Sequence, residues 1–363
     1  MKETFLCSCG LGGRNLSGQN LGGRGLCWRS LFLVGLFLVG LFCVVAAFSH
    51  DAATAAAETS AAESLGAGPT ALSSRGLLPN RSQPEVLVDP GWLAERLCQP
   101  DLRILELGKR DAYDLGHIPQ AAFVDWISDI TDPDLPERYN VLSGRQMEQL
   151  LSRLGVGKKT TVVLYDRLAN RLATRMFWSL RLYGHQQIEI LNGGGNAWSV
   201  ARQPLVTEVP TFAHTKYRVD PLDGALQADR AFIKSQLAKP QFALVDGRPT
   251  GQYTGQLPGK VFHTGKPHAR RGHLPQAVNI PWQENLTADG RFKSVNRLRK
   301  IYNEHGVTPE STVVTYCNEG LHAAHPWFVL TELLGYRQVR LYDDSLSEWA
   351  NTSDAPLVTS RDK

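Results

Sequence analysis

The sequence predicts an α/β protein made of two copies of one unit, each a mostly parallel sheet with helices on both faces. The first observation is an internal repeat: TVVLYD at 161–166 returns as TVVTYC at 312–317, and Trp198 returns as Trp349, both 151 residues later. The second is that short apolar strands alternate with segments of helical periodicity. This alternation implies a parallel sheet, because the chain must cross back over the sheet between neighbouring strands.

The elements of the second copy can be placed in order. The apolar run FALVD predicts a short buried strand, and STVVTYC and QVRLYD have the same character. Two longer segments carry apolar residues at helical spacing, and each ends at or just before a glycine, as helices often do. The expected strands are 242–246, 311–317 and 338–343, and the expected helices are 295–305 and 322–335.

Length, composition and charge exclude several classes of protein. A chain of 363 residues is long enough for two or three domains. A hydrophobic share of 42% and a charged share of 20% are ordinary for a folded protein, which excludes wholesale disorder. The net charge is +4, of which residues 1–50 carry +3. The near-neutral remainder argues against nucleic-acid binding, which requires a strongly basic surface.

The N-terminal region resembles an export signal. Residues 31–48 form a run of eighteen residues without a charge, and arginines precede it. A basic flank before an apolar run is typical of a secretory signal or a signal-anchor, and eighteen residues just span a bilayer. Small residues after the run favour cleavage, whereas the long glycine-rich stretch before it favours an anchor, so both outcomes stay open. We expect an extracytoplasmic protein, periplasmic or exported, secreted or anchored through residues 31–48.

Composition also divides the rest of the chain. The segment after the leader is rich in Ala, Ser, Gly and Pro and cannot bury enough apolar surface to offset chain entropy, which predicts a flexible tether. A proline-containing stretch separates the two copies. The expected organisation is a leader at 1–50, a tether at 51–84, a first domain at 85–204, a linker at 205–222 and a second domain at 223–358.

The cysteines are unevenly distributed. Four of the six lie before residue 50, and the two copies contain only Cys98 and Cys317. A disulfide scaffold and a cysteine-based zinc site are therefore not expected. Cys98 ends an amphipathic segment, which predicts a packing role. Because the two cysteines belong to different copies, we expect both to be free thiols.

Cys317 has the position of a functional thiol. It lies at the carboxyl end of a predicted strand, where parallel sheets bind their ligands. Gly320 lets the following loop curl so that its N–H groups point inward, and the next helix offers the positive end of its dipole. Both effects predict a lowered pKa for the thiol, and the alternative is a buried, inert cysteine. The same offset places Asp166 at this point of the first copy, which therefore lacks the nucleophile.

Several motifs together resemble the two-domain rhodanese-type sulfurtransferases, which act on thiosulfate or 3-mercaptopyruvate. The resemblance covers 86–358 and implies two tandem rhodanese-like domains, of which the first is inactive. The motifs are GHIPQA at 116–121, GHLPQA at 272–277, LVDGR at 244–248, the strand ending at Cys317 and LYDDSLSEW at 341–349. In that family a six-residue loop beginning with cysteine cradles the sulfur. Here the loop is Cys317, Asn318, Glu319, Gly320, Leu321 and His322.

The resemblance implies a double displacement. The Cys317 thiolate takes a sulfane sulfur from thiosulfate or 3-mercaptopyruvate, holds it as a persulfide and passes it to cyanide or a thiol. The partners are then a small-molecule donor and a thiophilic acceptor, and no metal or organic cofactor is needed. The competing hypothesis is a rhodanese-like sulfur carrier, sensor or partner-binding module with little or no turnover. A cysteine-dependent phosphatase needs an arginine about six residues after the cysteine, and position 323 is alanine.

The loop departs from the family pattern at the residues that select the donor. Thiosulfate-preferring relatives carry basic residues after the cysteine, whereas mercaptopyruvate-preferring relatives carry small neutral ones and end the loop in threonine. Here Asn318 and Glu319 follow the cysteine, and His322 ends the loop. A carboxylate beside the thiolate raises its pKa and repels a dianion, and a protonated histidine would partly offset this. The donor therefore stays open.

Three arginines are candidates for donor binding. Arg248 follows Asp246 and either contacts the donor or forms an ion pair that holds the end of the strand. Arg270 and Arg271 lie in the stretch that carries substrate-binding arginines in the family, and the alternative for both is a solvated loop.

Overall fold

The computed structural model describes residues 86–134, 139–262 and 264–359, all within one compact unit, Pro79–Lys363. The predicted signal or anchor at 31–48 and the tether at 51–84 lie outside these residues. Among the helices of the described part, none has the length and apolar character needed to cross a membrane.

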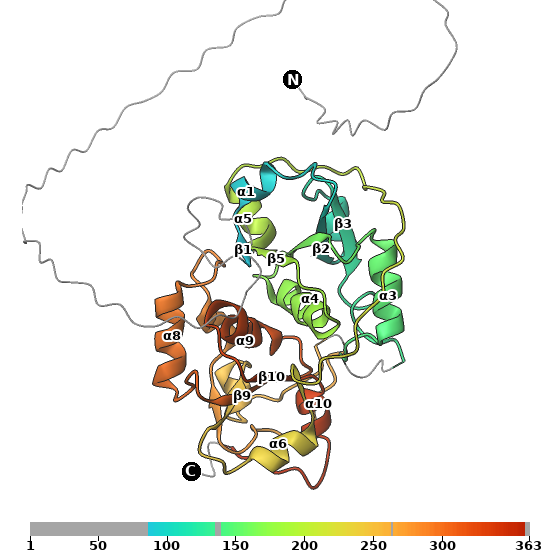
Figure 1. The fold of residues 1–363 in the computed structure, drawn as a ribbon. Coiled ribbons are helices and arrows are strands. Elements are labelled where there is room, and N and C mark those ends of the chain that lie inside the picture. Colours follow the sequence, from blue (N-terminus) through green and yellow to red (C-terminus); the bar gives the residue numbers. More distant parts are fainter. Residues whose placement is uncertain (1–85, 135–138, 263, 360–363) are drawn as a thin grey trace, which may run out of the picture. The chain divides into compact units, whose positions relative to one another are not determined.

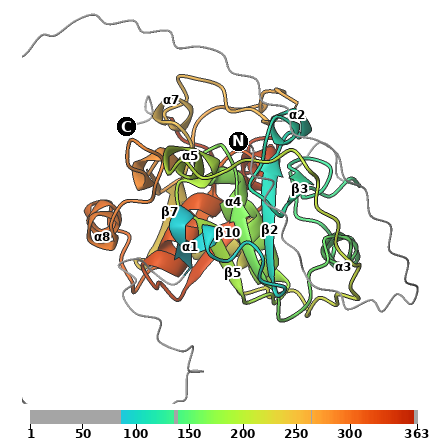
Figure 2. The same ribbon diagram turned by 90° about the horizontal axis from the view of Figure 1, so that it is seen from above.

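The first domain is a five-stranded sheet in the order β1-β5-β4-β2-β3. All of its strand pairs are parallel. Figure 2 labels three of its strands, β2, β3 and β5. The strands are β1 (Leu87–Val88), β2 (Leu102–Gly108), β3 (Ala121–Asp125), β4 (Thr161–Tyr165) and β5 (Ile188–Leu191). The helices are α1 (Pro90–Ala94), α2 (Arg110–Asp114), α3 (Gly144–Arg153), α4 (Arg171–Leu182) and α5 (Gly194–Val200).

The second domain repeats this order as β6-β10-β9-β7-β8, again with every pair parallel. The strands are β6 (Gln227–Ala228), β7 (Phe242–Asp246), β8 (Ala277–Asn279), β9 (Thr312–Tyr316) and β10 (Val339–Tyr342). The α-helices are α6 (Arg230–Gln236), α7 (Thr250–Tyr253), α8 (Val295–Glu304), α9 (Ala324–Phe328) and α10 (Ser345–Trp349). A 3-10 helix, η1 (Trp282–Asn285), and a π-helical turn, η2 (Val329–Leu333), complete it. The predicted α/β fold with two tandem parallel-sheet domains is confirmed.

The predicted elements of the second domain match closely, with one difference. The expected strands are present to within a residue or two at each end, and α8 ends two residues before Gly306. The helix expected from residue 322 instead begins at Ala324, because the preceding residues close the loop around Cys317. It then changes to π geometry, in which Leu334 N–H donates to the Val329 carbonyl at 2.9 Å.

Matching caps start equivalent helices in the two domains. The Asp89 side chain accepts the Trp92 N–H at 2.8 Å before α1, and the Asp229 side chain accepts the Phe232 N–H at 2.6 Å before α6. Each carboxylate satisfies a helix N–H that would otherwise have no partner in the helix. The repeat is therefore visible in local hydrogen bonding as well as in sheet order.

The repeated Gly-His-x-Pro-Gln turn is structural in both copies. The His117 ring contacts the Tyr113 carbonyl at 3.0 Å, and the His273 ring contacts the Tyr253 carbonyl at 2.8 Å. The glutamine of each turn, Gln120 or Gln276, has a φ of 66°. Two domains with different loops at their strand ends share this turn, so it serves the fold.

The helices cover both faces of each sheet, and one apolar core runs through both domains. Leu87, Leu105 and Val162 of the first domain and Val245 and Val313 of the second belong to the same buried cluster. Helix α4 packs against α9 where the domains meet (Figure 1). Separate clusters cover the outer faces beneath α1 and α5 and beneath α6 and α10.

A buried ion pair joins the domains next to the predicted catalytic loop. Arg175 Nη1 on α4 lies 2.6 Å from Asp343 Oδ1, and both side chains are almost completely buried. Asp343 Oδ2 also accepts the Val141 N–H at 2.9 Å, and Arg175 Nη2 donates to the Tyr139 carbonyl at 2.8 Å. Removing one partner would leave a buried charge unpaired, which is costly. This pair therefore constrains how the two domains meet.

The cysteines differ from the expectation at one position. Cys317 is a free thiol as expected, and its side chain is buried. Cys98 is disulfide-bonded, so the expectation of a free, packed Cys98 is wrong. Cys98 follows α1 and is exposed rather than packed in the core. Its exposed position makes it accessible for disulfide formation.

Candidate functional site

Cys317 lies immediately after β9, which is the central strand of the second sheet. Its side chain is only 1% exposed. The backbone N–H groups of Glu319, His322 and Ala323 point at the sulfur. A ring of N–H groups at the carboxyl end of a central strand attracts negative charge, which suits a thiolate or a sulfur adduct carried on it.

Ser345 holds the loop in this shape. Its hydroxyl oxygen accepts the N–H groups of Cys317 and Gly320, both at 3.1 Å, and its hydroxyl donates to the Tyr342 carbonyl at 2.7 Å. Gly320 has a φ of +81°, and a Cβ there would lie 2.5 Å from Asp343 Oδ1. The prediction that Gly320 lets the loop curl is confirmed, and glycine is required for both conformation and space.

The resting thiol is less acidic than the loop pattern predicted. Burial raises the pKa of Cys317 above its usual value, although the surrounding N–H groups lower it. The expectation of a lowered thiol pKa is therefore wrong, because it counted the N–H groups and not the desolvation of the anion.

Glu319 is buried inside the loop rather than exposed beside the sulfur. Its Oε1 accepts the Phe262 N–H at 2.9 Å. Burial raises the pKa of Glu319 to about 8, against the opposing effects of that N–H and of Arg175. The side chain is thus mostly protonated at neutral pH, so the repulsion of anions expected from a carboxylate is largely absent below about pH 8.

His322 is also uncharged. Burial together with the charge of Arg171 lowers the pKa of His322 to about 3. Its Nε2 lies 3.1 Å from Arg171 Nη1, and its ring lies against Trp282 at 5.8 Å between centroids. A protonated His322 therefore does not offset Glu319 at neutral pH; the cation beside the loop is Arg171, with His322 as its acceptor.

The two remaining side chains of the loop are held by the second domain. Asn318 Nδ2 donates to Gln252 Oε1 at 3.0 Å, and Asn318 Oδ1 lies 3.3 Å from His268 Nε2. Leu321 is buried in the shared core. These contacts fix the loop's backbone without adding charge to it.

Arg248 and Arg270 are both engaged with protein groups. Arg248 is buried; its Nη2 lies 2.6 Å from Asp246 Oδ2 and donates to the Gly272 carbonyl at 2.8 Å. Arg270 donates to the carbonyls of Trp349 at 2.9 Å, of Ala350 at 3.1 Å and of Ala355 at 2.6 Å. Both geometries are those of structural residues that hold the strand end and the C-terminal segment.

Arg271 differs from its neighbour Arg270. It is exposed on the loop before the Gly-His turn. This is the position of a solvated side chain, the alternative that the sequence left open for it.

The loop of the first domain shows what kind of chemical group a loop of this shape can enclose. Asp166 occupies the position of Cys317 and is completely buried. Its Oδ1 accepts the N–H groups of Leu168 and Asn170 at 2.7 and 2.9 Å, and its Oδ2 accepts those of Leu172 and Ala173 at 2.6 and 2.9 Å. The loop and the first turn of α4 therefore enclose the carboxyl group with four backbone N–H groups. Burial raises the pKa of Asp166 and these N–H groups oppose the rise, so the arrangement is suited to negative charge.

Sequence reasoning missed three residues of the site. Arg171 stands at the position of His322 in the first domain, and the offset of 151 could have paired them. Ser345 and Asp343 belong to the LYDDSLSEW motif, but only their contacts with the loop reveal what they do.

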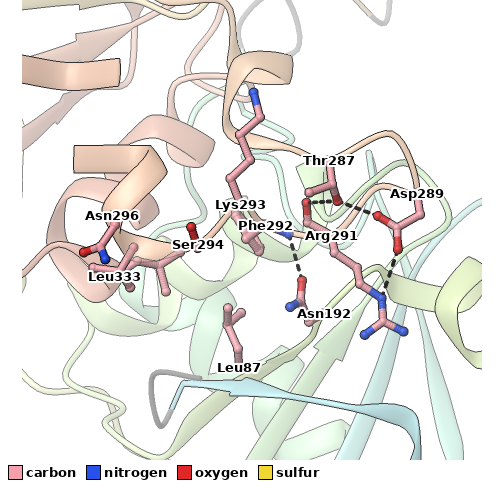
Figure 3. Close-up of a pocket in the computed structure, with 11 residues that line it drawn as sticks. Leu87, Asn192, Thr287, Asp289, Arg291, Phe292, Lys293, Ser294, Asn296 and Leu333 are labelled. Carbon is pink, nitrogen blue, oxygen red and sulfur yellow. Dashed lines mark hydrogen bonds and ion pairs between the residues drawn. The ribbon is translucent and has the colours of Figure 1, made fainter. Parts of the chain in front are cut away.

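The described residues form at least three cavities on the domain boundary, and two of these have volumes of about 500 Å³ or more. One of about 500 Å³ lies beside the first domain's loop and is lined by Lys109, Arg171 and Phe262, among others. The other, of about 520 Å³, contains Arg291, which pairs with Asp289 at 3.3 Å, and Asn192, which accepts the Phe292 N–H at 2.9 Å (Figure 3). No residue of the loop at 317–322 lines either of these two cavities.

Sequence comparison with known proteins indicates the same two-domain architecture. The family model described as "Rhodanese-like domain" matches residues 89–201 and 230–352. The "Sulfur carrier protein TtuD" of Thermus thermophilus is 37% identical over 281 residues, which are 76% of this chain and 98% of that protein. The "Putative thiosulfate sulfurtransferase SseA" of Mycobacterium tuberculosis is 36% identical over 284 residues, 77% of this chain and 93% of that protein.

Solved structures share the fold. "The wildtype structure of EanB" superposes with a TM-score of 0.67 at 22% identity and covers 76% of this chain and 69% of that one. The anaerobic ergothioneine biosynthesis enzyme from Chlorobium limicola gives a TM-score of 0.66, also at 22% identity, over 76% and 70% of the two chains. At this identity the likeness shows the fold alone.

Fold and site together define a tandem rhodanese-type protein, with one loop closed by a carboxylate and one that holds a cysteine. The chain belongs to the rhodanese-like sulfurtransferase family, whose members act on small sulfur donors and acceptors.

Replacing Asp166 tests the anion-binding shape of the first loop. Asp166→Ala leaves four buried N–H groups without a partner, and each costs about 1–3 kcal/mol. We expect the free energy of unfolding in urea to fall by at least about 3 kcal/mol, and by less in Asp166→Asn, which keeps one acceptor oxygen. Asp114→Ala, which removes an exposed ion pair with Arg110, should cost less than about 1 kcal/mol. An Asp166→Ala protein within about 1 kcal/mol of wild type contradicts this account.

Protonation of Glu319 makes stability depend on pH. Its pKa rises from 4.5 to about 8 on folding, so the native state binds more protons than the unfolded state between these values. Its contribution to stability is therefore full below pH 4.5 and is lost as pH rises to about 8. Relative to Glu319→Gln, wild type should lose up to about 1.4 kcal/mol per pH unit in this window, measured by urea unfolding. Parallel profiles would refute the assignment, and the exposed control Glu304→Gln should follow wild type.

Proposed function

We propose that this protein is a sulfurtransferase that carries sulfur as a persulfide on Cys317. The observation that carries the proposal is the pair of loops: the first holds the Asp166 carboxylate with four N–H groups, and the second presents N–H groups of the same kind to the free thiol of Cys317. A persulfide anion would receive the same stabilisation as that carboxylate.

The reaction is a double displacement. The Cys317 thiolate attacks the sulfane sulfur of the donor, forming an S–S bond while the bond from that sulfur to the donor breaks and its electron pair leaves with the first product. With thiosulfate the product is sulfite; with 3-mercaptopyruvate it is pyruvate, whose new methyl group takes up the thiol proton. An acceptor such as cyanide or a thiol then removes the terminal sulfur and regenerates Cys317.

The charge state of the site is compatible with anionic donors at neutral pH. Glu319 is mostly protonated below about pH 8, His322 is neutral, and Arg171 adds a positive charge. Above pH 8 two effects oppose each other, because the thiol ionises more while the ionised Glu319 repels the donor. Activity should therefore pass through a maximum on the alkaline side.

A sulfur carrier is the alternative, and one similar protein carries that name. A carrier forms the same persulfide but passes the sulfur to a protein partner and turns over small acceptors slowly. The two functions therefore differ in the second half-reaction.

Intact mass analysis tests the proposal. After incubation with thiosulfate or 3-mercaptopyruvate, wild type should gain the mass of one sulfur atom, cyanide should remove it, and thiocyanate should form over many cycles. Cys317→Ser should gain nothing, whereas Cys98→Ser should behave as wild type. An adduct with no repeated turnover favours the carrier; no adduct with either donor contradicts both functions.

We also propose that the chain acts outside the cytoplasm, exported or anchored through residues 31–48. The support is the charge-free run behind its basic flank. In a bacterial host, a C-terminally tagged full chain should fractionate with the periplasm or membrane, and a variant with Leu36 and Leu38 changed to arginine should stay in the cytoplasm. Cytoplasmic location of both proteins contradicts this proposal.

A further inference from the structure

The first domain forms most of a cavity beside its own loop, and two residues that line this cavity, Arg171 and Phe262, also contact the catalytic loop. The cavity has a volume of about 500 Å³ and lies at the carboxyl end of β2, bounded by Phe262 of the second domain. Two aromatic rings, Trp126 and Phe262, form part of its wall and stand 5.2 Å apart between centroids. A cavity of this size with apolar walls and a few polar groups is typical of a site for a small organic molecule.

The polar groups of the cavity are mostly cationic. Lys109, Arg167 and Arg171 face one carboxylate, Glu106. Arg167 Nε donates to Glu106 Oε1 at 2.7 Å, and Tyr165 donates to the other oxygen of the same carboxylate, so Glu106 and Arg167 neutralise each other. The cavity thus keeps an excess of positive charge, which favours the entry of an anion.

Arg171 is the cation of this cavity that contacts the catalytic loop. Its guanidinium lies over the Phe262 and Trp282 rings, at 4.9 and 5.6 Å from their centroids. Its Nε is buried with no hydrogen-bond partner, and among the described residues no carboxylate lies within ion-pair distance of it. A partly desolvated guanidinium without a carboxylate partner can bind one through the N–H groups that protein groups do not use.

Two residues that line the cavity contact the catalytic loop. Arg171 Nη1 lies 3.1 Å from His322 Nε2, and the Phe262 N–H donates to Glu319 Oε1 at 2.9 Å. Burial lowers the pKa of the Arg171 guanidinium, and the negative charges of Asp166, Tyr139 and Cys317 oppose this effect. An anion bound at Arg171 is therefore next to the loop that carries the nucleophile.

We propose that Arg171 of the first domain binds the carboxylate of a monoanionic organic sulfur donor, such as a mercapto-carboxylate, and that the cationic cavity is its route of entry. The inference rests on the proposed function and specifies its substrate class. One guanidinium without a carboxylate partner matches one carboxylate. Arg248 and Arg270 are occupied by protein groups, so the two charges of thiosulfate would be incompletely balanced. Arg171 is thus a substrate-binding residue supplied by the domain that lacks the cysteine.

Alkylation of Cys317 tests this without requiring sulfur transfer. Iodoacetate carries a carboxylate and iodoacetamide does not, while both form an S–C bond at Cys317 and release iodide. In the full-length protein, Arg171→Gln should lower the ratio of the iodoacetate rate to the iodoacetamide rate about ten-fold, and Arg171→Lys should restore part of it. Arg181→Gln, on the same helix but paired with Glu332, should leave the ratio unchanged.

Donor kinetics complete the test. Wild type should prefer 3-mercaptopyruvate to thiosulfate in kcat/KM, and Arg171→Gln should raise KM for 3-mercaptopyruvate about ten-fold with a smaller change in kcat. An unchanged alkylation ratio, or equal losses with iodoacetate and iodoacetamide, overturns the role of Arg171. A ratio that falls as expected while no donor yields a persulfide leaves the anion site in place and refutes the proposed function instead.

Discussion

The structure depends on one constraint: the N–H groups of the loop that follows the central strand of each sheet converge on one point, and that point must hold an acceptor. Buried N–H groups without a partner are costly, so each loop is built around what fills it. In the first domain the filler is the side chain of Asp166, and in the second it is the sulfur of Cys317. The positive φ of Gly320 and the contacts of Ser345 follow from this requirement.

This comparison explains how one fold supports two roles. A carboxylate that belongs to the loop is a permanent occupant, so the first loop is closed to any external anion. A thiol is a weaker acceptor, and it leaves the N–H groups available for negative charge that appears on sulfur during a reaction. The first domain thus has the same loop shape as the second, but a carboxyl group occupies it instead of a thiol.

The site is nevertheless completed by both domains. The second domain supplies the nucleophile but holds its own nearby arginines in structural contacts, and both of its ionisable loop side chains are uncharged at neutral pH. Positive charge comes from Arg171 across the boundary. The buried pair between Arg175 and Asp343 ties the helix that begins with Arg171 to the segment that holds the catalytic loop, so charge and nucleophile are positioned by the same contact.

Local patterns were sufficient for the fold and for the position of the nucleophile. The repeat, the strand–helix alternation and the placement of Cys317 after a strand are properties of nearby residues, and each is visible in the sequence. Charge states were not predictable in this way. Glu319 and Cys317 differ from their expected protonation, and His322 is neutral, because burial dominates. Burial depends on the other domain and on the segment around Phe262. Arg171 was missed for the same reason, since its contact with His322 spans 151 residues.

The most direct test of this account is a crystal structure of the protein after reaction with a sulfur donor. The account predicts additional density on Cys317 alone, with the terminal sulfur within hydrogen-bond distance of the backbone N–H groups of the loop at 318–323. A terminal sulfur turned away from those groups, or sulfur bound at another residue, would contradict the claim that the loop's backbone is what holds the reacting anion.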